Sequence, residues 1–230
     1  RLRPLYKYVL TGKKDETKYA LDRGFEHPLM SRFENSMPVG VDILGQDVVL
    51  AETDLQEVES AAWSGEVTSG NLFLRALYDY TGKQFNSSLA YYSQAVEDAV
   101  EEGGYESLYS AFYRLNRGVL RAEMIEFISS MESNVQVLSM DDSGTTRARV
   151  KDQITRQYDY TEAIEDMQKA AELVPNLPYA YYNLGNLYCL SAEHLASIEN
   201  YTKAIELYPK MGDAYFNRGL VLIYLKDKEK

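Results

Sequence analysis

The sequence contains few of the residues that build catalytic or metal-binding sites. Its 230 residues include one cysteine, Cys189, two histidines, His27 and His194, and one tryptophan, Trp63. A single cysteine excludes an internal disulfide and leaves the redox compartment undetermined. No set of His, Cys and carboxylate residues has metal-ligand spacing, and no glycine-rich phosphate loop is present. We therefore expect no enzyme activity, no cofactor and no metal site, and we expect Trp63 to anchor its region onto the rest of the chain.

Positive charge and long apolar runs are also scarce. The chain has 24 Lys and Arg residues against 35 Asp and Glu, a formal net charge of −11, and a sequence pI near 4.8. Nucleic acid requires a basic stripe that faces its phosphates, so the composition disfavours a nucleic-acid partner. No apolar run approaches the ~18 residues of a membrane span. The hydrophobic content of 45% is ample for a buried core in one or two domains.

From about Tyr158 to Leu225 the sequence repeats itself with a period of 34 residues. The same step joins several pairs of identical residues: Ala170 and Ala204, Pro175 and Pro209, Ala180 and Ala214, Tyr181 and Tyr215, Asn183 and Asn217, Gly185 and Gly219. A fixed period of this length indicates stacked helical repeats, and 34 is the tetratricopeptide period. The spacing within one copy agrees: Tyr181-x-x-Leu184-Gly185-x-x-Tyr188, then Ser197-x-x-x-Tyr201, Ala204 and Pro209. The chain closely resembles the tetratricopeptide repeat (TPR) family.

The spacing also has a direct physical reading. Two antiparallel helices that cross closely need small side chains at the crossing, so we expect Gly185 to face Ser197 and Ala204. Large residues at helical spacing fill the space around that crossing. Pro209 cannot continue a helix and ends the second one. One such pair cannot bury its apolar face alone, so several must stack.

The expected fold is mainly α, a TPR-like α–α superhelix with a partly β N-terminal segment and a β-hairpin insertion in one repeat. Residues 1–66 form the N-terminal segment and residues 67–230 the helical repeat domain. The units are expected at about 70–103, 105–175, 178–209 and 212–230, the last one incomplete. Within residues 1–66 we expect a strand at 5–10, a hairpin at 38–51 and a short helix at 54–62. We expect the chain to be a piece of a longer protein, and its localisation is unknown.

The unit at 105–175 is interrupted in sequence. Residues 105–131 predict one long helix, and its Asn116-Arg117-Gly118 copies Asn217-Arg218-Gly219, the small-residue corner of a first helix. The matching second helix follows only at 158–174. Alternation around an Asp/Ser/Gly turn predicts a hairpin at about 134–150, which we expect to pair with residues 38–51. The alternative is that residues 142–157 form an irregular first helix of another repeat.

The resemblance implies a function. In this family the first helices of successive repeats line a concave groove, and Asn amides there can bind a peptide backbone as donor and acceptor. The corresponding residues here are Phe112, Asn116, Tyr179, Tyr182, Asn183, Asn186, Phe216 and Asn217, with Asp213 on the same face. They imply a scaffold or adaptor that binds a protein or peptide. Two alternatives stay open: these residues are ordinary repeat consensus, or the aromatic residues bind a glycan.

Overall fold

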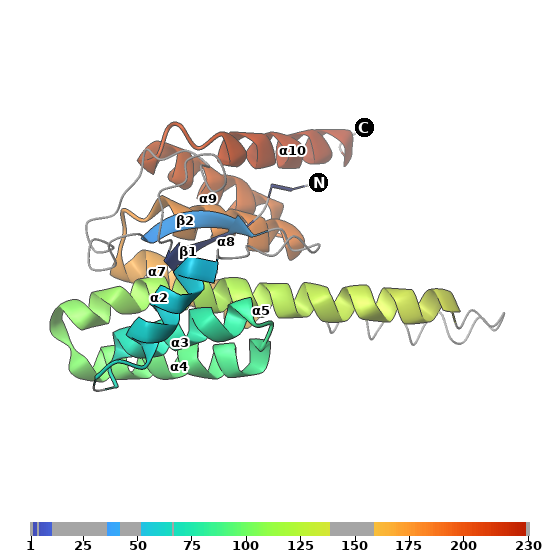
Figure 1. Ribbon diagram of the computed structural model, residues 1–230. Helices are drawn as coiled ribbons and strands as arrows, with labels where there is room; N and C mark the ends of the chain where they lie inside the picture. Colours follow the sequence, from blue (N-terminus) through green and yellow to red (C-terminus); the bar gives the residue numbers. More distant parts are fainter. Residues whose placement is uncertain are drawn as a thin grey trace.

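The computed structural model describes residues 2–3, 5–10, 36–41, 52–65, 67–138 and 159–228. These residues are mainly helical, and two short strands pair with one another. The helices are α2 (Glu52–Ala62), α3 (Ser69–Thr81), α4 (Phe85–Glu102), α5 (Gly104–Leu138), α7 (Thr161–Leu173), α8 (Pro178–Leu190), α9 (His194–Leu207) and α10 (Gly212–Lys228). Consecutive helices pack against one another from α2 to α10. Figure 1 shows the strands between α5 and the C-terminal helices.

The pair α8 and α9 crosses at Gly185. Ser197 Oγ donates to the Gly185 carbonyl at 2.7 Å, and a Cβ on Gly185 would lie 2.5 Å from two ring carbons of Tyr201. Tyr201 and Ala204 are fully buried. The predicted close approach is confirmed, with the Tyr201 ring as the surface that Gly185 faces. Pro178 begins α8, where a missing N–H costs nothing.

The pair α3 and α4 repeats this crossing. Ser88 Oγ donates to the Ala76 carbonyl at 2.7 Å, with the same separation of twelve residues as between Gly185 and Ser197. Tyr92 and Ala95 are buried in the places that Tyr201 and Ala204 take in the other pair. The turn within each pair has one non-glycine residue at positive φ, Lys83 at 59° and Ala192 at 63°. The two pairs therefore share a helix crossing and a turn, although their sequences differ.

The interrupted unit is closed by α5 and α7. A Cβ on Gly118 would lie 3.0–3.1 Å from atoms of Ala163, Asp166 and Met167 in α7, as the motif in the sequence predicts. Asp166, 2% exposed, accepts two hydrogen bonds from Arg117 Nε, at 2.9 and 3.2 Å, and one from Arg117 Nη2 at 2.6 Å. Its second oxygen also accepts one from Arg121 at 2.7 Å. This buried cluster joins two helices that a long stretch of chain separates.

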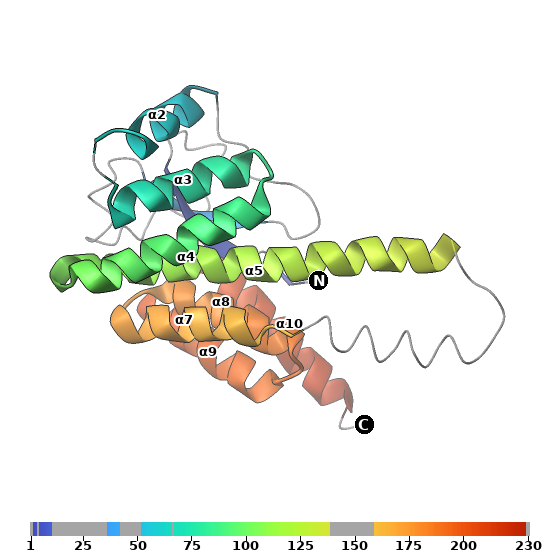
Figure 2. The same cartoon turned by 90° about the horizontal axis from the view of Figure 1, so that it is seen from below.

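The predicted hairpin at 134–150 is wrong over residues 134–138. These residues belong to α5, which extends past the other helices (Figure 2). Val135, Val137 and Leu138 alternate with polar residues, but Ile128, Met131, Val135 and Leu138 also follow helical spacing. A short apolar run is compatible with either period, and here the helix continues. The rest of the predicted insertion, and the alternative helix at 142–157, lie outside the described residues.

The N-terminal segment contributes the strands. The predicted strand at 5–10 is confirmed as β1 (Leu5–Leu10), and the predicted helix at 54–62 as α2. The strand expected from residue 38 is β2 (Ser36–Val41), which pairs antiparallel with β1, Leu5 facing Val41 and Leu10 facing Ser36. The pairing of residues 38–51 with 134–138 is therefore wrong, and residues 42–51 lie outside the described chain. Trp63 packs edge-on against Tyr78 of α3, with ring centroids 5.2 Å apart.

Candidate peptide-binding site

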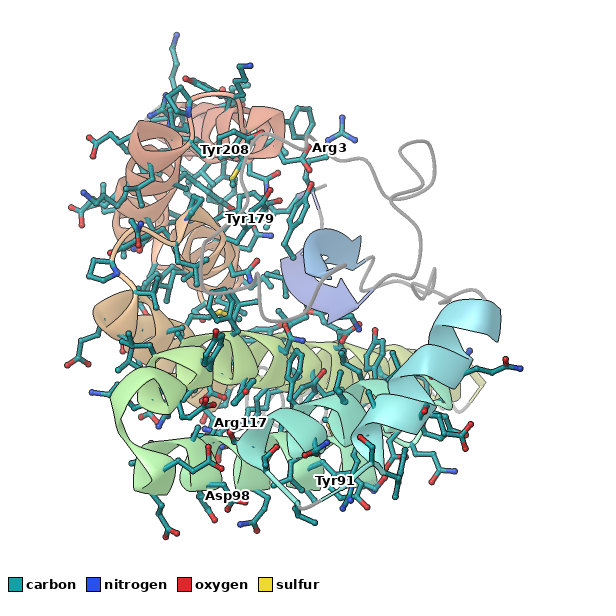
Figure 3. All side chains as sticks on the ribbon, turned by 60° about the vertical axis from the view of Figure 1, so that its left-hand side comes forward. Arg3, Tyr91, Asp98, Arg117, Tyr179 and Tyr208 are labelled. Carbon is teal, nitrogen blue, oxygen red and sulfur yellow. The ribbon has the colours of Figure 1, made fainter. Side chains whose placement is uncertain are left out.

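The predicted groove residues of α8 and α10 contact the chain's own N-terminal segment. We call these side chains the strand-contacting face; they are Tyr179, Tyr182, Asn183, Asn186, Asp213, Phe216 and Asn217. Figure 3 shows Tyr179 and Arg3 on the side of the helices that faces the strands. The segment meets this face through Arg3 and Tyr6, and α5 packs against β1 as well. Three of the face's amides are almost fully buried: Asn183 and Asn217 at 0% and Asn186 at 2% exposure.

Asn183 binds both backbone groups of Tyr6. The Tyr6 N–H donates to Asn183 Oδ1 at 2.9 Å, and Asn183 Nδ2 donates to the Tyr6 carbonyl at 2.7 Å. In an antiparallel strand the backbone groups of successive residues point to opposite edges. Since β2 lies along one edge of β1, the side chain of Asn183 takes the place of a neighbouring strand on the other edge. This pairing does not depend on the side chain of the bound residue.

Asn217 and Asn186 bind Arg3 in a similar way. The Arg3 N–H donates to Asn217 Oδ1 at 2.7 Å, and Asn186 Nδ2 donates to the Arg3 carbonyl at 3.1 Å. The amides are fixed by further bonds, because Tyr201 Oη and Asn217 Nδ2 both donate to Asn186 Oδ1, at 2.6 and 2.8 Å. The Asn186 and Asn217 amides are thus held by side chains of the helices as well as by Arg3, and the Tyr201 bond links the α8–α9 crossing to the site.

The distance between successive repeats agrees with the distance between the backbone groups that their asparagines bind. Asn183 and Asn217 are 34 residues apart, and the residues they bind, Arg3 and Tyr6, are three apart. Neighbouring packed helices lie about 8–10 Å apart, and three residues of extended chain span about 10 Å. Two asparagines that are one repeat apart therefore bind backbone groups that are three residues apart.

The side chains of the segment also find partners. The Tyr6 ring packs against Tyr179 and Tyr182, with centroids 5.1 and 5.3 Å away, and its hydroxyl donates to Asp213 Oδ2 at 2.7 Å. Burial, and then the Asp213 carboxylate, raise the pKa of the Tyr6 hydroxyl far above its usual range. The Arg3 guanidinium lies 4.5 Å from the Phe216 ring centroid, and its Nε is 3.9 Å from Asp213 Oδ1.

The other two predicted groove residues lie on α5. Phe112 and Asn116 are both buried, and Asn116 Nδ2 donates to Tyr92 Oη at 3.3 Å. The site that the contacts above define is built by α8 and α10. The repeat pattern of the sequence places Asp213 on this face but does not show which segment occupies it. One signal was available, because residues 1–14 contain five basic residues and no acidic one.

Two family models match the region of α7, α8 and α9. A model described as "TPR repeat" matches residues 156–190, and one described as "Tetratricopeptide repeat" matches residues 178–211. The chain contains tetratricopeptide repeats. Their matched region includes α8 and α9, so Asn183 and Asn186 are TPR residues by sequence as well as by geometry. TPR repeats generally mediate protein–protein interactions. A comparison with curated proteins finds no match.

The described residues offer little for other kinds of site. No three His, Cys, Asp or Glu side chains among them are grouped to hold a metal ion. None of the described helices is long and apolar enough to cross a bilayer. The His194 ring packs against Tyr224 with centroids 4.9 Å apart. The rings of Tyr179 and Tyr182, on which a glycan site would depend, are buried and pack against Tyr6.

Proposed function

We propose that this protein is an interaction scaffold whose TPR helices bind an extended segment of a partner protein. In this proposal the stacked pairs form a short α–α superhelix, and the strand-contacting face is its concave groove. The observation that carries the proposal is that Asn183 binds the backbone of Tyr6 in β1, while Asn217 binds the backbone of Arg3, three residues earlier. Main-chain recognition gives affinity for any extended chain, as strand addition does elsewhere.

The present occupant of the groove is β1 of the same chain, so a partner segment must compete with it. A covalently attached competitor acts at an effective concentration on the order of millimolar when its tether is short and flexible. A partner therefore binds more weakly to the intact chain than to one whose own segment has left the groove. The scaffold is consequently controlled by the stability of its own strand.

The test uses a full-length released variant, Arg3→Ala with Tyr6→Pro. Proline at position 6 removes the N–H that Asn183 accepts and the ring that Tyr179 and Tyr182 hold. A fluorescently labelled decapeptide with the sequence of residues 1–10 is titrated into this variant, and binding is followed by fluorescence anisotropy. We expect saturable binding to the released variant and at least about tenfold weaker apparent binding to the wild-type chain, whose own strand competes.

The asparagines provide matched variants in the same assay. We expect Asn183→Ala in the released variant to lower the affinity for the decapeptide by about tenfold, because two hydrogen bonds to the peptide backbone are lost. Asn200→Ala is the control, since its side chain donates to the Ala196 carbonyl within α9 and not to β1. Circular dichroism establishes that each variant is folded. Equal affinity for the Asn183 and Asn200 variants would refute backbone recognition on this face.

A further inference from the structure

We infer that the groove recognises side chains as well as backbone. Its partner carries an arginine three residues before a tyrosine in an extended segment. This inference rests on the proposed function and specifies the partner's chemistry. It is drawn from the residues that occupy the face, since a bound segment shows what the site accommodates. The partner is a segment of another protein with the pattern Arg-x-x-Tyr.

One carboxylate reads both positions. Asp213 accepts a hydrogen bond from the Tyr6 hydroxyl through one oxygen, at 2.7 Å, and its other oxygen is 3.9 Å from Arg3 Nε. Asn217 of α10 and Asn183 of α8 bind the backbones of Arg3 and Tyr6, and a single acidic side chain at the start of α10 lies within 4 Å of both side chains. A phenylalanine in place of the tyrosine would leave this oxygen of the carboxylate without the tyrosine donor.

The tyrosine is the principal anchor. Tyr6 is 4% exposed and its ring contacts two tyrosines of α8. Aromatic anchors in desolvated pockets dominate binding free energy at interfaces. The Arg3 side chain is 54% exposed, and its contact with the Phe216 ring is therefore of the weaker, solvent-screened kind. We expect the tyrosine to contribute more to affinity than the arginine.

The charge distribution of the chain favours a basic segment on this face, and a further basic residue follows the tyrosine. Lys7 is 2% exposed, and its ammonium lies over the ring of Tyr80 in α3. Residues 1–14 carry a charge of +5, so the other 216 residues carry −16 of the total of −11. A body of that charge attracts a basic segment and repels an acidic one, which favours specificity and fast association.

The test compares four decapeptides in the released variant defined above: the sequence of residues 1–10, and the same sequence with Arg3→Ala, Tyr6→Phe or Tyr6→Ala. We expect losses of affinity of about twofold to fivefold for Arg3→Ala, about tenfold for Tyr6→Phe and more for Tyr6→Ala. Asp213→Asn in the protein should weaken binding of the original peptide more than binding of the Tyr6→Phe peptide, which keeps only the exposed Arg3 contact with this carboxylate. Such coupling between the two substitutions would show that Asp213 recognises the tyrosine hydroxyl of the peptide.

The outcomes separate the two proposals. If all four peptides bind equally, the groove holds backbone without reading side chains, and this inference is refuted while the proposed function stands. If none binds, both are refuted. If the wild-type chain is dimeric at micromolar concentration and Arg3→Ala with Tyr6→Ala is monomeric, the segment belongs to a second copy, and the assignment to another protein is overturned.

A second measurement needs no released strand. In the intact chain, hydrogen exchange of the Tyr6 amide reports how firmly the segment is held, because that N–H donates to Asn183. Tyr6→Phe and Asp213→Asn should each speed its exchange by about tenfold, and the double variant should be no faster than Asp213→Asn alone. Unchanged exchange in Asp213→Asn would refute the role of this carboxylate.

Discussion

Two glycines at the same position of successive repeats give a matched test of the helix crossing. A Cβ on Gly185 would lie 2.5 Å from two carbons of the Tyr201 ring, whereas a Cβ on Gly219 would meet no atom within 4 Å. Ordinary carbon contacts are about 3.5–4.0 Å, so Gly185→Ala requires a movement of about 1 Å. The Tyr201 ring is fully buried and its hydroxyl is bonded to Asn186, which leaves it little room to move.

The expected magnitudes follow from two opposing effects. Overpacking a core costs about 1–3 kcal/mol, and a contact this short places Gly185→Ala at the upper end. Replacing glycine by alanine inside a helix raises the free energy of unfolding by about 1 kcal/mol, because alanine has the higher helix propensity. We therefore expect Gly185→Ala to lower the free energy of unfolding by about 2 kcal/mol. Gly219→Ala should raise it by up to about 1 kcal/mol, since only the helix-propensity gain remains.

Thermal and urea unfolding followed by circular dichroism at 222 nm measure both changes. For a chain of this size 1 kcal/mol corresponds to about 2–4 °C in Tm, so the two variants should differ by about 6–12 °C. Tyr201→Leu in the Gly185→Ala background should recover part of the loss, because it removes the ring that the new methyl group meets. If Gly185→Ala is as stable as the wild-type chain, the assigned crossing of α8 and α9 is incorrect.

Three further predictions concern other parts of the fold. Asp166→Ala should lower the free energy of unfolding in urea by about 3–5 kcal/mol, because Arg117 and Arg121 lose a buried partner; a loss below 1 kcal/mol would refute this. Ala192→Gly should raise it by about 1 kcal/mol by relieving a positive φ, and an unchanged urea midpoint would count against that strain. Burial raises the pKa of the Tyr6, Tyr92 and Tyr201 hydroxyls, so the unfolded chain releases these protons first as pH rises. Stability should therefore fall above about pH 10, by about 1.4 kcal/mol per pH unit per tyrosine, and absorbance at 295 nm should show these residues ionising together with unfolding rather than before it.

The helical pairs could be predicted from sequence because their signals are local. The 34-residue period, Gly185 and Ser197 locate one crossing, and the structure places them together. The pairing of α5 with α7 also follows from one motif, Asn116 to Gly118. The residues between the two helices break the 34-residue period, so the period alone does not indicate this pairing. The limits of domains, and the binding role of the groove residues, stay predictions.

The long-range contacts of the N-terminal segment could not be predicted in the same way. The strand at 5–10 has a local pattern, but nothing near it in sequence indicates that Asn183 would bind its backbone. Asn is also usual at that position in the resembled family, so its identity could not distinguish packing from binding. The extension of α5 through Leu138 could not be predicted, because the same apolar residues satisfy both a period of two and a helical period.

Asn183 on the strand-contacting face also bears on the tendency of this chain to aggregate. β1 is covered along one edge by β2, and Asn183 takes up the backbone groups of Tyr6 on the other. An extended strand with an uncovered edge is a template for pairing with other chains, and native proteins cover such edges. A partner that displaced β1 would uncover that edge, so the two amide bonds that hold β1 on the proposed binding face would also keep its edge from pairing with other chains.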